Sequence, residues 1–314
     1  MNKCSLLQKW AHPQFLVRVC AIVEATGVII GRDFESFEYG SSCRGEAGRR
    51  ETTLSREDCW AEFPMKDFLL ELCVETKEAA LAAEAGGADQ IEMCTELSIG
   101  GLTPSFPLLT ATVKSLSIPV SVLIRLRGGD FTSTAGEFEQ MRKQIEQAKQ
   151  AGAAGVVVGI LCSDGRVDVE RTRALVELAY PMKAVFHRAF DMASDLSEAL
   201  EAVVETGADC LLTSGGASDV LAGADAIARL HKQARGRLDV MAGGGFALGN
   251  LVEVVRRAGV SLFHGSFVRW EVTGGGARRR APFSPTALEA DVRQAVQLIQ
   301  RECQKRKSLA MSMR

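Results

Sequence analysis

The sequence predicts an α/β protein of the (β/α)8 or TIM-barrel class, with a single domain that follows a poorly ordered N-terminal extension. Three observations lead to this fold. Apolar strand-like runs recur eight times after Met65, amphipathic helical patterns lie between most of them, and several of these helical patterns end in a similar glycine-containing phrase. Glycine at that place supplies the left-handed residue that closes a helix. Eight units of one strand and one helix within about 200 residues are typical of a closed barrel.

The N-terminal segment, residues 1–64, differs from the rest of the chain. It holds four of the nine cysteines and two of the three tryptophans, and its Gly40–Arg50 stretch is polar and loop-like. A transit peptide is one reading of this segment, but the amphipathic, Ser-rich pattern of such peptides is poor in it. We expect a disordered extension, or a segment that is not part of the native protein, with the functional start at Met65. The expected divisions are therefore the extension 1–64, the barrel 65–307 and a tail 308–314.

The eight apolar runs define the strands of the expected barrel, because branched and aromatic residues suit a buried, pleated surface. In order, they are Phe68–Cys73, Gln90–Cys94, Val120–Arg125, Gly155–Leu161, Lys183–His187, Asp209–Thr213, Leu238–Met241 and Val260–His264. A doubly wound sheet is the rival architecture. The barrel is favoured because such a sheet would contain an unusual number of parallel strands.

Helical periodicity between the runs supplies the outer layer of the expected barrel. The helical patterns are Thr76–Ala85, Glu137–Ala151, Val169–Ala179, Leu196–Glu205, Val220–Ala234 and Leu251–Ala258. The pattern after the second run, held between Pro104 and Pro119, is weak. Val272–Arg280 contains three consecutive glycines and is expected to be a mobile linker. A last helix, with Ser284 as N-cap, Pro285 in its first turn and a core-facing stripe after it, is expected to be the eighth barrel helix.

The overall composition argues against two classes of partner. The formal net charge is -2, with 46% hydrophobic and 24% charged residues, which gives no general attraction to nucleic acid or to a membrane surface. No apolar run reaches the ~18 residues that a membrane span needs. The nine cysteines form no Cys-x-x-Cys motif and their number is odd. We therefore expect free thiols in the reducing cytoplasm.

Acids, thiols and histidines stand where the expected strands end, which is where a TIM barrel places its chemistry. Residues two apart on a strand point the same way, so the repeated Glu-x-Cys pattern predicts two carboxylates and two thiols in one region. Two thiolates are natural ligands of Cu(I), although either cysteine could instead be a small buried hydrophobe. The histidines could likewise be hydrogen-bonded core residues. The candidate metal ligands are Cys73 and Cys94, and the candidate acid–base residues are Glu71, Glu92, His187, Asp191 and His264.

Arginines and glycine-rich turns at other strand ends predict an anion site. Bare backbone N–H groups after the sixth to eighth strands resemble a phosphate cradle, although glycine is also needed for tight turns. The arginines could instead pair with inward carboxylates in a structural network. The candidate anion-binding residues are Arg125, Arg127, Arg188, Ser214, Gly215, Gly244, Gly245 and Ser266.

Taken together, the sequence stretches around these candidate residues resemble the CutC family of copper homeostasis proteins. The matching stretches run in family order and are Glu71–Val74, Gly86–Cys94, Gly100–Ser105, Ile124–Phe131, Phe186–Met192, Leu212–Gly215, Gly243–Gly245 and Phe263–Ser266. The resemblance implies a TIM barrel, a cytoplasmic homo-oligomer (a dimer or a tetramer) and a link to copper. It also implies Cys73 and Cys94 as the Cu(I) ligands. Leu126 departs from the pattern, because proline is expected there.

Three hypotheses for function follow. The first is a Cu(I)-binding copper homeostasis protein, and its alternative is an enzyme of unknown reaction that acts on a small anionic or phosphorylated substrate at the barrel mouth. The third is a structural or interaction protein whose barrel has an inert polar mouth. The first two share one geometric expectation, namely that five side chains surround a common hollow. These are Glu71, Glu92, Arg125, His187 and His264.

Overall fold

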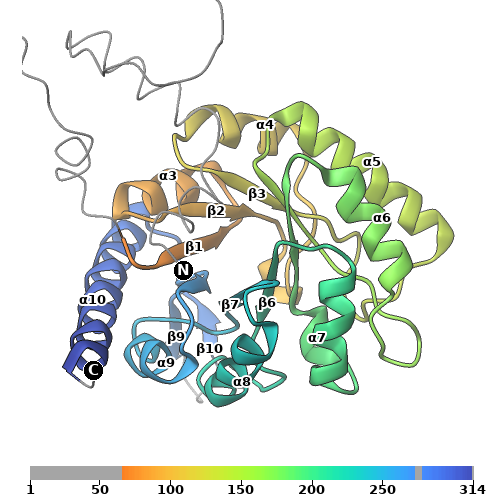
Figure 1. Cartoon of the computed structure of the whole chain (residues 1–314). Coiled ribbons are helices and arrows are strands. Elements are labelled where there is room, and N and C mark those ends of the chain that lie inside the picture. Colours follow the sequence, from red (N-terminus) through yellow and green to blue (C-terminus); the bar gives the residue numbers. More distant parts are fainter. Residues whose placement is uncertain (1–65, 273–277, 313–314) are drawn as a thin grey trace, which may run out of the picture. The chain divides into compact units, whose positions relative to one another are not determined.

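Eight parallel strands form a closed barrel in the computed structural model, which describes residues 66–272 and 278–312 (Figure 1). The strands pair in chain order, and the first strand also pairs with the eighth. The predicted TIM barrel is thus confirmed. The strands are β1 Leu69–Val74, β2 Gln90–Met93, β3 Val120–Leu123, β4 Gly155–Val158, β5 Lys183–Phe186, β6 Cys210–Thr213, β7 Asp239–Ala242 and β8 Leu262–Gly265. Each overlaps the run predicted for it, whereas the expectation for residues 1–64 lies outside the described residues.

Helices alternate with the strands and cover the outside of the barrel. They are α3 Lys77–Gly86, α4 Phe106–Ser115, α5 Ala135–Ala151, α6 Val169–Ala179, α7 Leu196–Glu205, α8 Ala224–Ala234, α9 Leu251–Ala258 and α10 Pro285–Ser312, with short 3-10 turns η2 Leu97–Ile99 and η3 Arg188–Met192. The helix expected from Val220 begins at Ala224, with Gly223 as its N-cap. Within the described residues, no helix has both the length and the apolar character to cross a membrane.

The ends of α5 illustrate how local sequence sets the helix boundaries. The Thr134 side chain accepts a hydrogen bond from the Glu137 N–H, and the Glu137 carboxylate accepts one from the Thr134 N–H at 2.8 Å. This reciprocal capping box satisfies two N–H groups that the first helical turn leaves without partners. Gly152, with φ of 81°, closes the helix in the left-handed conformation that glycine adopts without strain.

The last helix closes the outer ring, as the sequence predicts. Helix α10 packs against both α3 and α9 (Figure 1), and Val292 and Ile299 are fully buried in that contact layer. Gly86 permits the close approach of α3, because a Cβ there would lie 2.6 Å from the Cβ of Val292. The helix continues to Ser312, past the boundary at 307 where a tail was expected to begin.

The prediction of a mobile linker over residues 272–280 is wrong at both ends of that segment. Strands β9 Trp270–Val272 and β10 Arg278–Arg280 form an antiparallel pair, which the high glycine content between them concealed. An Arg280 guanidinium nitrogen also forms an ion pair with the Glu75 carboxylate at the end of β1. The segment is therefore tied to the barrel at its C-terminal end.

Alternation along the strands sorts their side chains onto two faces. Leu70 and Leu72 of β1 belong to the hydrophobic core beneath the helices, so Glu71 and Cys73 lie on the opposite face, inside the barrel. The same alternation applies to the neighbouring strands, where Ile91, Met93 and Phe263 belong to the outer core. The polar residues on the inner face of these three strands are Glu71, Cys73, Gln90, Glu92 and His264.

Candidate metal centre

Two carboxylates, two thiols and an imidazole come together inside the barrel, where β1, β2 and β8 lie side by side. The strand register places Cys73 beside Glu92 and Glu71 beside His264. Cys94 directly follows β2 and is fully buried. We call this set the inner cluster, and it consists of Glu71, Cys73, Glu92, Cys94 and His264. Its formation confirms the expectation that the repeated Glu-x-Cys pattern brings these groups into one region.

Glu71 fixes the orientation of the imidazole. Its carboxylate is completely buried, accepts a hydrogen bond from Gln90 Nε2 at 2.6 Å, and lies 2.7 Å from His264 Nδ1. Burial alone would lower the pKa of His264. The hydrogen bond to Glu71 and the negative charges of Glu92 and Glu71 outweigh burial, so the pKa is raised. Because Nδ1 faces Glu71, Nε2 is the ring nitrogen left for another partner.

The two cysteines form a close pair of free thiols. Their sulfurs lie 3.2 Å apart, Cys73 Sγ donates to Glu92 Oε1 at 3.3 Å, and Cys94 Sγ lies 3.6 Å from the Val74 carbonyl oxygen. The hydrogen bond with Cys94, burial and the charge of Glu92 raise the pKa of the Cys73 thiol well above its usual value. The Cys73 thiol therefore keeps its proton at neutral pH until a bound cation stabilises the thiolate.

Glu92 carries an unusual oxygen. Within the described part of the chain, its Oε2 atom is buried and has no hydrogen-bond partner. Burial raises the pKa of this carboxyl to about 7; the Glu71 charge adds to the rise and the His264 charge opposes it. A buried polar atom without a partner is rare in native proteins, so this oxygen is free to contact a ligand.

The inner cluster also satisfies the distance requirement for an ion. One ligand atom each from Cys73, Glu92 and His264 can be chosen so that all three lie within 4.8 Å of one another. Sulfur, oxygen and nitrogen donors at that spacing fit a metal ion, and the two adjacent thiols fit a soft ion such as Cu(I).

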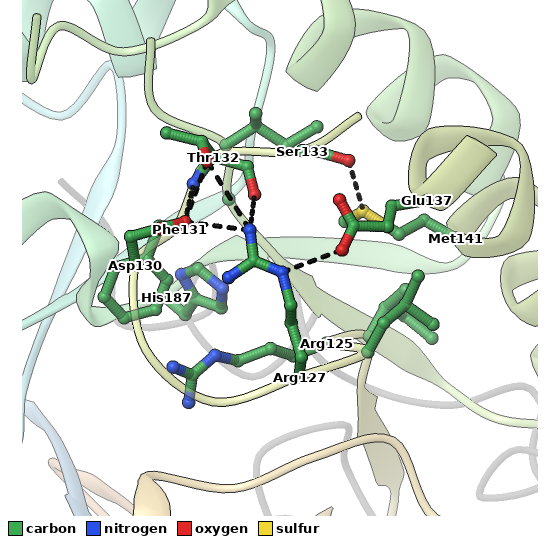
Figure 2. Close-up of a pocket in the computed structure, with 13 residues that line it drawn as sticks. Arg125, Arg127, Asp130, Phe131, Thr132, Ser133, Glu137, Met141 and His187 are labelled. Carbon is green, nitrogen blue, oxygen red and sulfur yellow. Dashed lines mark hydrogen bonds and ion pairs between the residues drawn. The ribbon is translucent and has the colours of Figure 1, made fainter. Parts of the chain in front are cut away.

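Arg125, Arg127 and His187 line a different hollow, which is shown in Figure 2. It offers about 30 Å³ to solvent, enough for about one or two water molecules. Phe131 forms part of its wall, with its ring 5.1 Å from the His187 ring. The hollow contains neither the acids nor the thiols of the inner cluster.

The two arginines of this hollow bind groups of the chain itself. Arg125 donates to the carbonyl oxygens of Ile99, Gly101 and Gly129 at 3.0–3.2 Å, and its guanidinium lies 4.6 Å from the Phe131 ring centre. Burial, followed by the charge of Arg127, lowers the pKa of Arg125. Arg127 forms ion pairs with Asp130 and Glu137 (Figure 2). These bonds organise the loop after β3 and occupy most of the donors that an anion would need.

His187 is held in a neutral state. Its Nδ1 accepts a hydrogen bond from the Ala189 N–H at 3.2 Å, so the proton of the neutral ring is on Nε2. Burial and then the charge of Arg125 lower the pKa of His187 to about 3. A histidine with this pKa stays uncharged at physiological pH, which makes it a weak candidate for proton transfer there.

Most of the remaining predicted residues lie at the ends of β5, β6 and β7, where they form a third group, whereas Ser266 follows β8. Asp191 accepts hydrogen bonds from Thr213 and from the loop after it, and Arg188 donates to Asp191 and to Ser214 Oγ. Gly244 lies directly beneath Arg188, because a Cβ there would be 2.9 Å from the guanidinium carbon. Gly215 N donates to Thr213 Oγ1, Gly245 is exposed and Ser266 is half-buried. By their hydrogen bonds the predicted site residues thus fall into three groups. The groups are neighbours, because the charge of Arg188 acts on His264 and that of Asp191 acts on His187.

Sequence reasoning missed Gln90, the residue that holds the second oxygen of Glu71. A signal for it exists, because Gln90 lies two positions before Glu92 on the same strand and shares its inward face. Gly101 was also overlooked. A Cβ on it would lie 2.7 Å from a methyl carbon of Leu123, so glycine permits the close approach of this loop to β3.

Comparisons with known proteins agree with this architecture. The model of the CutC family matches residues 68–269. The human protein named "Copper homeostasis protein cutC homolog" is 46% identical over 197 residues, which cover 63% of this chain and 72% of the human one. A CutC family protein from Chromobacterium violaceum is 44% identical over 200 residues, covering 64% of this chain and 81% of that relative.

A solved structure supports the same assignment. The crystal structure of a CutC protein from Streptococcus agalactiae superposes with a TM-score of 0.61 and 28% identity, over 64% of this chain and 99% of that one. The family match spans the whole strand barrel from β1 to β8 and includes every residue of the inner cluster. The chain belongs to the CutC family.

Proposed function

We propose that this CutC-family protein binds Cu(I) in the cytoplasm, with Cys73 and Cys94 as its ligands. The observation that carries the proposal is the pair of buried free thiols, whose sulfurs lie 3.2 Å apart inside the barrel. Soft thiolates are the ligands that Cu(I) prefers. The name of the human relative, which refers to copper homeostasis, supports the same cargo.

The surroundings of the thiols suit the uptake of a cation. Glu92 accepts from Cys73 Sγ, so this carboxylate is placed to receive the proton that the thiol loses when an ion binds. Burial keeps water from competing for the ion, and the carboxylates of Glu71 and Glu92 provide negative charge beside it. Free cysteines along the described chain, including Cys162 and Cys303, support a reducing compartment.

Replacing both cysteines by serine is expected to abolish stoichiometric Cu(I) binding. The wild-type protein should take one equivalent from a chromophoric Cu(I) chelator under anaerobic, reducing conditions, and the C73S/C94S variant should take none. Cys162→Ser is the control, because it removes a half-exposed thiol elsewhere in the barrel and should leave binding unchanged. One equivalent of Cu(I) on the double variant would rule out this pair as the ligands.

An acid–base enzyme that acts on a small anionic or phosphorylated substrate is the second candidate. It is favoured by the Glu92 carboxyl, whose pKa of about 7 suits proton transfer near neutrality. Arg188 is the best placed anion donor, because its side chain is 42% exposed and lies over Gly244.

A thermal-shift screen of small phosphorylated and carboxylate compounds tests the enzyme candidate. A ligand held at about 100 times its dissociation constant stabilises a protein by about 2.7 kcal/mol, which gives a clear rise in the unfolding temperature. The rise should disappear in Arg188→Ala and persist in Arg142→Ala, which removes an exposed arginine. A screen with no shift, or a shift that Arg188→Ala retains, would count against anion binding at this place.

Three expectations about partners stay predictions. These are a homo-oligomer, either a dimer or a tetramer, and the lack of binding to nucleic acid or to membranes. They rest on the family resemblance and on the formal net charge of -2.

A further inference from the structure

We propose that the inner cluster also forms a site for a divalent cation of the Zn²⁺ type, with Cys73 Sγ, a carboxylate oxygen of Glu92 and Nε2 of His264 as ligands. The site shares Cys73 with the proposed Cu(I) site. It does not use Cys94, and it therefore goes beyond the proposed function and can fail or hold independently of it.

The spacing of the three donors fits one ion. They lie within 4.8 Å of one another, and Cys73 Sγ is already 3.3 Å from Glu92 Oε1. Tetrahedral ligands at Zn²⁺ bond lengths of about 2.0–2.3 Å are separated by roughly 3.3–3.8 Å. Small side-chain movements are enough to bring all three donors to such distances.

The imidazole is oriented as in many zinc sites. Metal-binding histidines usually donate their other ring N–H to a carboxylate, which fixes the ring and increases the basicity of the ligand nitrogen. His264 Nδ1 lies 2.7 Å from Glu71 Oε1, and Gln90 holds the other oxygen of that carboxylate at 2.6 Å. Glu71 is thus the positioning residue of the imidazole, and Nε2 remains for the ion.

The unpartnered oxygen of Glu92 is an independent sign of a ligand. Glu92 is 96% buried, and its Oε2 has no partner within residues 66–272 and 278–312. Leaving such an oxygen without a partner costs free energy that a bound cation would recover. A bound dication would also offset the negative charges that Glu71, Glu92 and a Cys73 thiolate would carry together in this buried place.

The mixed donor set distinguishes this ion from Cu(I). One sulfur, one nitrogen and one oxygen suit Zn²⁺ or its substitute Co²⁺, whereas two sulfurs suit Cu(I). Three protein ligands leave a fourth position for water or another small ligand. The His264 side chain is 12% exposed while that of Glu71 is inaccessible, so the ion would approach from the side of the imidazole.

Titration with Co²⁺ tests the proposal, because cobalt bound to a thiolate gives a charge-transfer band in the near ultraviolet and tetrahedral cobalt absorbs strongly in the visible. The reduced, metal-free full chain should show both features with one equivalent of Co²⁺, and Zn²⁺ should remove them. His264→Asn keeps a side-chain donor for Glu71 but lacks Nε2. Mutations of residues that only hydrogen-bond to a metal ligand typically lower metal affinity by about 10–100-fold. Because His264→Asn removes a ligand itself, its Co²⁺ affinity should fall by more than that. Glu92→Gln should weaken binding in the same direction.

Cys94→Ser is the matched variant that separates the two sites. It should keep the cobalt spectrum and lose Cu(I), while His264→Asn should keep Cu(I) and lose cobalt. A wild-type protein without the charge-transfer band, or an unchanged cobalt affinity in His264→Asn, would overturn the divalent site. Loss of the spectrum in Cys94→Ser would assign the ion to the two thiols and would likewise overturn it. Circular dichroism on each variant shows whether the barrel is folded.

Discussion

Replacing Asp191 by alanine is expected to lower the free energy of unfolding by about 3–5 kcal/mol, although the sequence suggested an acid–base role for this residue. The side chain is 4% exposed, and its carboxylate accepts hydrogen bonds from five donor atoms. These are Arg188 Nε at 2.8 Å, Thr213 Oγ1 at 2.5 Å, Ser214 N at 3.0 Å, Ser214 Oγ at 2.9 Å and Gly216 N at 3.0 Å. Removing the carboxylate would leave four of these donors without an acceptor, and only Ser214 Oγ would keep another one, the Ala217 carbonyl oxygen. The loop after β6 is built around this carboxylate.

Urea unfolding of the metal-free protein measures this loss, and Glu139→Ala is the matched control. Glu139 also pairs with an arginine three positions away, but both side chains are exposed, so the change should cost at most about 1 kcal/mol. Asp191→Asn, which keeps one acceptor oxygen, should lie between the two. An Asp191→Ala protein as stable as Glu139→Ala would show that the carboxylate does not organise the loop, and would reopen a catalytic role.

The acid sensitivity of the barrel is expected to depend on His187. The pKa of this residue is about 3 in the folded protein, whereas an unfolded histidine has a pKa near 6.5. The folded state therefore binds fewer protons than the unfolded state between these values. The contribution of neutral His187 to the free energy of unfolding is therefore fully present above pH 6.5 and decreases as the pH falls toward 3. At pH 4 the loss is roughly 3 kcal/mol.

The variant His187→Asn isolates this contribution, since asparagine still offers an oxygen to the Ala189 N–H and does not titrate. Unfolding free energies of both proteins would be measured from pH 7 to pH 4 in the presence of a chelator. The variant is expected to be less stable at pH 7 through lost packing on Phe131, yet to lose about 3 kcal/mol less on acidification. Parallel curves would show that His187 is protonated in the folded state.

Periodicity explains why the sequence predicts the inner cluster. A strand alternates its faces at every residue, so Glu71 and Cys73 had to share a face whatever the rest of the fold, and the same holds for Glu92 and Cys94. Parallel strands in a barrel also place equivalent positions side by side, which brought Cys73 to Glu92. For these residues, local spacing and fold class together fixed the geometry.

Hydrogen-bond partners in the loops between helices and strands could not be predicted from periodicity. Arg125 binds three backbone carbonyls, and every residue has a carbonyl, so nothing in the sequence marks those of Ile99 or Gly129. The position of helix α4 was equally obscure, because two prolines flank it and its buried face is reduced to Leu109 and Thr112. Whether side chains at different strand ends share one hollow depends on loop paths, which periodicity does not encode.

The contact between Glu71 and His264 joins residues 193 positions apart and lies across the seam between β1 and β8. Neither half of the chain can make it alone. During synthesis the last strand leaves the ribosome long after the first, so the oriented imidazole exists only once nearly the whole domain has emerged. A nascent chain in which β8 has not yet paired with β1 therefore cannot bind an ion through this histidine. Metal binding through His264 would indicate that the barrel has closed.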